Sequence, residues 1–71
     1  MKRIAVTSRS LRALGYDPDD QVLEVEFHNG SVYRYEQVPA EVVQALLEAD
    51  SMGRYFNQVF KPQHYRYQRI G

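Results

Sequence analysis

At 71 residues the chain is long enough for one small domain and too short to enclose a deep catalytic cleft. It contains no cysteine, which excludes disulfides and thiolate chemistry, and it has no apolar run long enough to cross a bilayer. The nine basic and nine acidic side chains cancel to a formal charge of zero. We therefore expect a single soluble, cytoplasmic domain over residues 1–71 that does not associate with membranes.

The zero net charge conceals a segregated pattern. Residues 1–12 carry four basic side chains without an acid, and residues 51–71 carry four more without an acid. The segment between them holds all nine acids and only one basic residue, Arg34. If the two ends meet in the fold they form a basic patch. The simpler interpretation is that they are solvated charges paired with the acidic middle.

The first half of the chain predicts strands. A short strand is expected at residues 4–7 and a better defined one at residues 11–17. The acidic run at residues 17–20 has proline at its second position and aspartates that can bond to nearby backbone N–H groups, which indicates a turn. A calcium loop is not indicated, because the twelfth position of an EF-hand loop would be His28 and not glutamate.

A β-hairpin is predicted by two runs of alternating apolar and polar residues, 23–27 and 32–36, joined at Asn29-Gly30. A two-residue turn at Asn29-Gly30 would mix charged and apolar side chains on both faces. A three-residue loop, with Gly30 in the left-handed conformation of a bulge, makes one face wholly apolar. Because a slip of one residue turns every side chain over, burial favours the three-residue loop.

The hairpin register decides where the central tyrosines point. The three-residue loop places Leu23 opposite Tyr35 and puts Tyr33 and Tyr35 together on the apolar face. The other face then carries a favourable cross-strand pair between Glu24 and Arg34. We therefore predict that both tyrosines are core residues whose hydroxyls reach the rim.

Two helices are expected after the hairpin. The first begins near Pro39, which suits the first turn of a helix, and has apolar residues at helical spacing. Its apolar positions are Val42, Val43, Ala45, Leu46, Leu47 and Ala49. The second, capped by Asp50 or Ser51, repeats this spacing over a shorter stretch. Its apolar positions are Met52, Tyr55, Phe56, Val59 and Phe60.

A glycine inside the second helix, Gly53, costs about 1 kcal/mol relative to alanine and indicates close packing of the two helix ends, or a kink. Pro62 ends this segment, and residues 65–70 predict a last strand with its tyrosines on one face and Arg66 on the other. The expected fold is α+β: a small antiparallel sheet covered by two short helices, in the order β-β-β-α-α-β, with residues 4–7 as a further short strand.

Several short motifs, spread over almost the whole chain, resemble a known family. In the strand region they are Ser8-x-Ser10-Leu11, Gly15-Tyr16-Asp17, Leu23-x-Val25-x-Phe27-x-x-Gly30 and Tyr33-x-Tyr35. Further along they are Val38-Pro39 and Ala49-x-Ser51-x-Gly53-x-Tyr55-Phe56-Asn57. Together they resemble the KTSC domain, a family found at the C-terminus of some lysyl-tRNA synthetases and as small free-standing bacterial proteins. The resemblance implies RNA binding, because of the association with a tRNA-handling enzyme.

The sequence contains no catalytic constellation. His28 and His64 are the only histidines, and they have neither cysteines beside them nor the spacing of a metal site. We therefore expect a binding module and not an enzyme, with no metal and no other cofactor.

The preferred hypothesis is RNA binding, to tRNA or to single-stranded RNA. Proteins that bind single-stranded nucleic acid combine cations along the backbone path with aromatic platforms worth about 1–3 kcal/mol per stacked base. The expected RNA contacts are Arg34, Arg54, Tyr55, Arg66, Tyr67 and Arg69. The residues expected to have structural roles are Tyr33, Tyr35, Gly30 and Gly53. The alternative is a protein interaction module that docks a partner through an edge strand or through apolar residues of the second helix.

Overall fold

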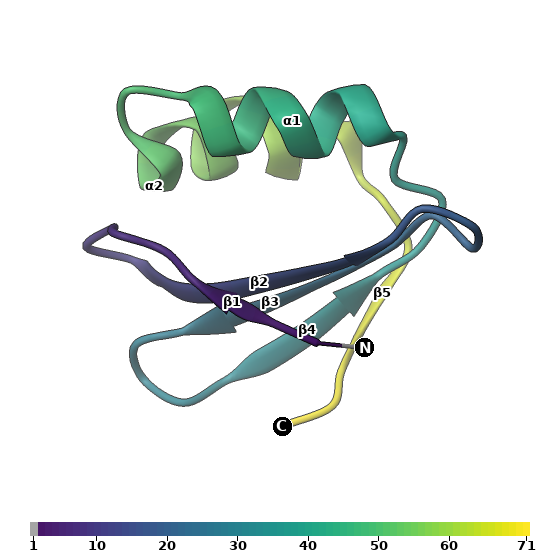
Figure 1. The fold of residues 1–71 in the computed structure, drawn as a ribbon, viewed down its shortest axis with the longest axis horizontal. Coiled ribbons are helices and arrows are strands. Elements are labelled where there is room, and N and C mark those ends of the chain that lie inside the picture. The colour runs from purple at the N-terminus through teal and green to yellow at the C-terminus, as the bar shows by residue number, and fades with distance from the viewer. Residues whose placement is uncertain (1) are drawn as a thin grey trace.

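A computed structural model describes residues 2–71 and shows an antiparallel sheet with helices on one face (Figure 1). Its five strands lie in the sheet in chain order, β1-β2-β3-β4-β5. The strands are β1 (Ile4–Ala5), β2 (Leu11–Asp17), β3 (Val22–Phe27), β4 (Val32–Tyr35) and β5 (Tyr67–Arg69). The helices α1 (Ala40–Glu48) and α2 (Met52–Tyr55) lie between β4 and β5 in the chain. The predicted α+β class is confirmed, and the additional strand expected at residues 4–7 is present but limited to Ile4–Ala5.

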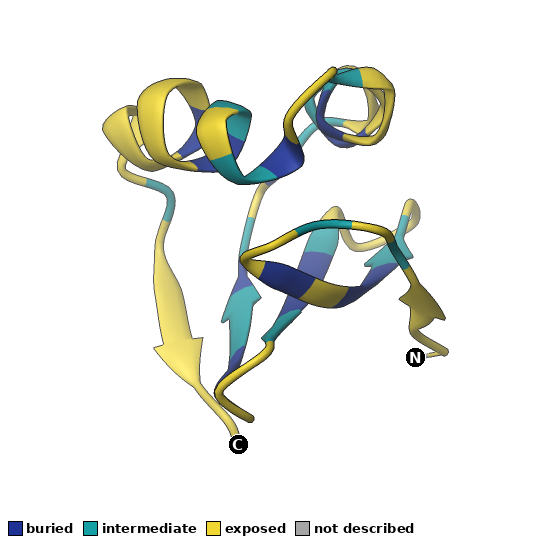
Figure 2. Ribbon diagram, turned by 90° about the vertical axis from the view of Figure 1, so that its left-hand side faces the viewer, coloured by how far each residue is buried: buried dark blue, intermediate teal, exposed yellow. Residues whose placement is uncertain are grey.

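The hydrophobic core lies between the sheet and the helices, where the middle strands and the inner sides of the helices are buried (Figure 2). Its largest fully buried side chains are Phe56, Phe60, Leu11, Leu23, Leu46, Val25 and Val38. Tyr35 is only 6% exposed and packs in the same cluster, which confirms its predicted place in the core. Tyr33 is half-buried and packs against the cluster from the side.

The hairpin between β3 and β4 has the predicted three-residue loop. Leu23 lies opposite Tyr35, and the N–H of Phe27 donates to the carbonyl of Ser31 across 2.9 Å. Gly30 has a φ of +92°, the one positive value among the loop residues. This left-handed conformation is open to glycine at little cost and strains other residues. The bulge at Gly30 therefore sets the register that turns the β4 tyrosines toward the helices.

Helix α1 contacts the sheet along a narrower stripe than its sequence predicts. It begins directly after Pro39, and Val43 and Leu46 are buried. Leu47, which the predicted stripe included, is 43% exposed. Successive residues on a helix are about 100° apart, so Leu46 and Leu47 do not both point at the sheet.

The second helical segment changes its winding along its length. The hydroxyl of Ser51 caps α2 by accepting a hydrogen bond from the N–H of Arg54 across 3.3 Å, as predicted for one of two candidates. The chain continues as a π-helical turn, Phe56–Phe60, and then as a 3₁₀ turn, Lys61–Gln63. Within the wider turn the Phe60 ring stacks on Phe56 with centroids 4.9 Å apart.

The apolar side of this segment is used inside the domain. Met52, Phe56 and Phe60 are buried, and Val59 is 41% exposed. Most of the apolar surplus expected on the second helix is therefore packed in the domain's own core, and Val59 remains at the surface. By contrast, β5 is exposed along its length at the edge of the sheet (Figure 2).

Candidate nucleic-acid interface

A groove of about 390 Å³ opens where β4 and β5 meet the end of the second helical segment. Tyr35 lies opposite Tyr67 in the pairing of these strands, and Tyr33 lies opposite Arg69. Cross-strand partners share a face of the sheet, so all four side chains are on the helix side. The residues that line this tyrosine groove are Tyr33, Tyr35, Phe60, Lys61, His64, Tyr65 and Tyr67.

Three tyrosine rings form one cluster that reaches from the core to solvent, in which Tyr67 also lies 5.4 Å from Tyr35 between ring centroids. Tyr67 stacks on Tyr33 with centroids 5.7 Å apart and planes 20° from parallel. Tyr33 in turn is stacked on Tyr35, with centroids 6.4 Å apart and planes at 24°. Tyr67 is 58% exposed, whereas Tyr35 is 6% exposed. The exposed ring is thus held in a defined orientation by rings that the core fixes.

One cation lines the groove and a second lies on the same face of the sheet. Lys61 lies over the Phe56 ring, with its Nζ 5.7 Å from the centroid, and also lines a smaller hollow beside Tyr33 at the hairpin loop. Arg69 lies on the same face as Tyr33, and its Nε donates to the carbonyl of Gly71 across 2.9 Å. No acidic side chain of the described chain lines the groove. Neither cation forms an ion pair with an aspartate or glutamate side chain of residues 2–71.

Burial raises the pKa of two phenols of the groove, those of Tyr35 and Tyr65. Burial, with smaller contributions from Tyr67 and Tyr33, raises the pKa of Tyr35 from 10.0 to about 12. Burial, followed by the effect of Tyr55, also raises the pKa of Tyr65. These hydroxyls therefore remain uncharged near neutral pH and do not repel an anion.

The six residues predicted to contact RNA lie in three places. Tyr67 and Arg69 belong to β5, directly after Arg66, whose carbonyl accepts from the N–H of Glu36 across 2.8 Å. Arg34 pairs with Gln68 and so lies on the sheet face that points away from the helices. The other two, Arg54 and Tyr55, belong to α2 and line a separate hollow together. The groove therefore unites only part of the predicted set.

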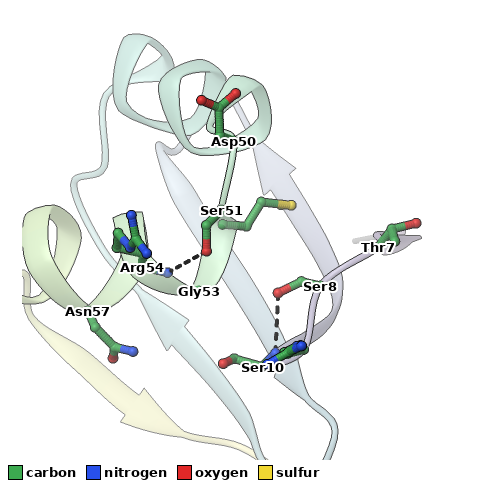
Figure 3. Close-up of a pocket in the computed structure, with 10 residues that line it drawn as sticks. Thr7, Ser8, Ser10, Asp50, Ser51, Gly53, Arg54 and Asn57 are labelled. Carbon is green, nitrogen blue, oxygen red and sulfur yellow. Dashed lines mark hydrogen bonds between the residues drawn. The ribbon is translucent and has the colours of Figure 1, made fainter.

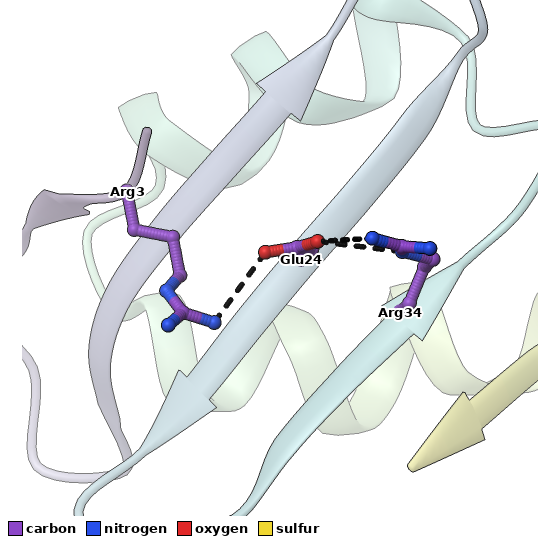
Figure 4. Close-up of polar contacts among 3 residues, drawn as sticks. All are labelled: Arg3, Glu24 and Arg34. Carbon is purple, nitrogen blue, oxygen red and sulfur yellow. Dashed lines mark hydrogen bonds and ion pairs between the residues drawn. The ribbon is translucent and has the colours of Figure 1, made fainter. Parts of the chain in front are cut away.

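Arg34 is engaged by a buried carboxylate on the outer face of the sheet, with the helices behind it (Figure 4). Its Nη2 donates to Glu24 across 2.9 Å and its Nε across 3.3 Å, which confirms the predicted cross-strand pair. Arg3 donates to the other oxygen of Glu24 across 3.4 Å, a contact that the sequence pattern did not suggest. The Glu24 side chain is 7% exposed, so this cluster is largely structural.

The two basic ends do not form one patch along the sheet, because β1 and β5 lie at its opposite edges. They approach each other at Arg9 and Arg54, which line a second hollow of about 620 Å³ between the loop before β2 and the start of α2 (Figure 3). The residues that line this serine hollow are Thr7, Ser8, Arg9, Ser10, Asp50, Ser51, Met52, Gly53, Arg54 and Asn57.

Gly53 explains how the two walls of the serine hollow come together. A Cβ atom at this position would lie 2.9 Å from the hydroxyl oxygen of Ser10 and 3.3 Å from its Cβ. Close packing at Gly53 was predicted, but the assigned partner, the end of the other helix, was wrong. The contact is made by the loop before β2, which is distant in the sequence.

Comparisons with known proteins agree with this structure. The KTSC domain model matches residues 7–67. The chain belongs to the KTSC domain family. An uncharacterized protein of Stutzerimonas stutzeri is 76% identical over 70 residues, which is 99% of either chain. A crystal structure of a KTSC domain protein from Yersinia pestis superposes with a TM-score of 0.89 at 37% identity, covering 99% of this chain and 97% of that one.

A KTSC segment also occurs within larger proteins. A lysine–tRNA ligase of Nostoc sp. is 38% identical over 60 residues, which is 84% of this chain and 10% of the ligase. The resemblance inferred from the motifs is thereby confirmed. In the described residues no helix of this KTSC domain is long and apolar enough to cross a membrane.

The KTSC motifs map onto both concave sites. Tyr33-x-Tyr35 supplies the floor of the tyrosine groove. Ser8-x-Ser10 and Ser51-x-Gly53 line the serine hollow from opposite sides, with Asn57 of the same second motif beside them. Lys61, His64 and the serines were not among the predicted site residues. The serines could have been found from the two polar motifs that contain small residues, because such motifs can pack closely against each other in the fold.

Proposed function

We propose that this KTSC domain is a non-catalytic module that binds single-stranded RNA through the tyrosine groove. The observation that carries the proposal is the exposed ring of Tyr67, stacked on Tyr33 in a groove whose lining contains Lys61 and no acid. A base needs an aromatic surface that is exposed and already oriented, because ordering a mobile ring would reduce the gain from stacking. Tyr67 meets both conditions.

The groove supports weak and sequence-tolerant binding. Every base has an aromatic face, so stacking on Tyr67 does not select one base over another. Lys61 and Arg69, on the helix side of the sheet, supply charges for the phosphates beside the stacked base. Arg66, which alternation places on the other face of the same edge strand, adds a charge at the rim of the groove. Contacts to about three phosphates would give a slope of log K against log salt near −2, since each contact to a single strand releases roughly 0.7 counterion.

The related segment in a protein named lysine–tRNA ligase supports RNA as the class of partner. The proposal retains Arg66, Tyr67 and Arg69 from the contacts predicted by sequence and adds Lys61 and His64. Arg34 is left out, because its guanidinium is bound to a buried carboxylate on the other face of the sheet.

Fluorescence anisotropy of a labelled oligouridine at low salt tests this proposal. Tyr67→Ala should weaken binding about 5- to 150-fold, because the lost stacking is worth about 1–3 kcal/mol, while Tyr67→Phe should retain most of the affinity. Lys61→Gln should weaken binding and flatten the salt slope, whereas Lys2→Gln, with the same loss of charge away from the groove, should change it little.

Two outcomes would overturn the proposal. The first is no binding of the oligonucleotide at low salt and high protein concentration. The second is equal affinity of the wild type and Tyr67→Ala. A partner whose binding resists salt would instead favour a protein docked on the exposed edge of β5.

A further inference from the structure

We propose that the serine hollow is a second binding site, specific for a phosphate monoester. It is independent of the tyrosine groove, because it lies at the α2 end of the helical layer whereas β5 follows the other end (Figure 1). Its walls come from two segments that are far apart in the chain, the loop of residues 7–10 and the segment of residues 50–57.

The serines offer hydrogen-bond donors to a ligand. The hydroxyl oxygen of Ser8 accepts from the N–H of Ser10 across 3.2 Å and from that of Leu11 across 3.3 Å. A hydroxyl oxygen has two lone pairs, and both lone pairs of Ser8 accept a hydrogen bond from the backbone. The Ser8 hydroxyl can therefore interact with a ligand only as a donor. Ser51 likewise accepts from the N–H of Arg54. Ser8, and to a lesser degree Ser51, are therefore biased toward donating, which suits an acceptor-rich ligand.

The charge of the lining selects an anion. Arg9 and Arg54 line the hollow, and neither belongs to an ion pair formed within residues 2–71. Asp50 is the single acid of the lining, and its carboxylate points away from the serines (Figure 3). Guanidinium groups bind phosphate oxygens in pairs of parallel hydrogen bonds, which an uncharged sugar cannot match.

The size of the hollow indicates that the phosphate is carried on a larger molecule. Its volume of about 620 Å³ falls within the range of about 300–1,000 Å³ that is usual for small-ligand sites, and it far exceeds what a bare oxyanion fills. A phosphate monoester with an organic group, either a free metabolite or the 5′ end of an oligonucleotide, fits both the charge and the room.

The serine loop is held in place before any ligand arrives. The Nε2 of His28, in the hairpin loop, lies 2.7 Å from the carbonyl oxygen of Ser8 and donates to it, because a carbonyl only accepts. The backbone N–H of His28 donates to the carbonyl of Ser10 across 3.3 Å. On the other side Gly53 lies against Ser10 so closely that a side chain would displace the hydroxyl. This preorganisation lowers the cost of binding.

Backbone NMR titration of the full chain tests the site with four probes: inorganic phosphate, adenosine 5′-monophosphate, and one oligouridine with either a 5′-phosphate or a 5′-hydroxyl. Saturable shifts are expected in residues 8–11 and 51–57 for the probes that carry a phosphate monoester. A response to the nucleotide alone identifies a small phosphorylated molecule, and a preference for the phosphorylated oligonucleotide over the hydroxyl form identifies an RNA end.

The matched variants are Arg54→Gln, Ser10→Ala and Arg12→Gln. Arg54→Gln should abolish the shifts and Ser10→Ala should weaken them, while Arg12→Gln, on a residue paired with Glu26, removes the same charge and should leave them intact. Absence of saturable shifts with either phosphate monoester at millimolar concentration, or equal losses in Arg54→Gln and Arg12→Gln, overturns the site. Shifts confined to the tyrosine groove would do the same while leaving the proposed RNA binding in place.

Discussion

Removing Arg34 should destabilise the domain more than removing the charge of Glu24, although the two residues form one ion pair. The Glu24 side chain is 7% exposed, and apart from Arg34 its carboxylate has only the longer contact of 3.4 Å to Arg3. The guanidinium of Arg34 needs the ion pair less for its solvation, because the Arg34 side chain is 42% exposed and reaches water. The two deletions therefore leave behind very different groups.

The magnitudes follow from this asymmetry. Breaking a fully buried pair by removing one partner costs about 3–5 kcal/mol. Arg3 remains in Arg34→Ala and water reaches both arginines, so we expect about 2–3 kcal/mol, a large part of the stability of a small domain. Glu24→Gln keeps the shape and a hydrogen-bond acceptor and leaves the arginines solvated, so we expect about 1 kcal/mol.

Urea unfolding followed by circular dichroism measures both free energies. The double variant Glu24→Gln/Arg34→Ala should be more stable than Arg34→Ala alone, because it no longer buries a carboxylate without its main partner. If Glu24→Gln lowers the unfolding free energy as much as Arg34→Ala does, the effect of the cluster on stability does not come from desolvation of the carboxylate. The same pair of variants also separates a loss of fold from a loss of RNA contact at Arg34.

Three further outcomes are expected from the central hairpin. Tyr35→Ala should lower the free energy of unfolding in urea by about 3 kcal/mol or more, because it empties a core position. Tyr35→Phe should change it little, because no buried side-chain polar atom of the described residues lacks a hydrogen-bond partner, so the hydroxyl is not an unsatisfied group in the core. Because the pKa of Tyr35 is raised to about 12, the folded state keeps a proton that the unfolded chain loses near pH 10. The unfolding free energy should therefore fall between about pH 10 and 12, and Tyr35→Phe should lessen that fall. Gly30→Ala should cost about 1–2 kcal/mol through backbone strain alone, since a Cβ there meets nothing within 4 Å, and Asn29→Ala should cost less in the same assay.

The sheet could be predicted in detail because its physical constraints are local. The alternation of residues 23–27 and a glycine at the bulge are enough to choose between two registers, since only one of them buries the apolar face. The π-helical turn at Phe56–Phe60 could not be foreseen in this way, because its apolar spacing also suits an α-helix. Leu47 was wrongly expected on the buried face of α1, because the spacing of apolar residues does not indicate how much of the helix surface the sheet covers.

The sites were predictable to a smaller extent, because they depend on tertiary contacts. Alternation along the last strand separated Tyr67 from its neighbours in the chain, but it did not indicate that Tyr67 shares a face with the β4 tyrosines. The sequence predicted the ion pair between Arg34 and Glu24, but it did not predict that Glu24 is buried. Glu24 lies on the outer face of the sheet, and its burial involves Arg3, a residue distant in the sequence that also contacts its carboxylate. The meeting of Ser10 with Gly53 joins two distant segments, and neither segment indicates the other.

The central claim, that the tyrosine groove binds RNA, is tested most directly by backbone NMR of the free chain titrated with unlabelled oligouridine at low salt. The account predicts that the amides with the largest shifts cluster at Tyr33, Lys61 and residues 64–69, and that these shifts shrink steeply as salt is raised. Unmoved spectra at high micromolar protein would contradict it. Shifts confined to the outer face of the sheet around Arg34 would contradict it equally.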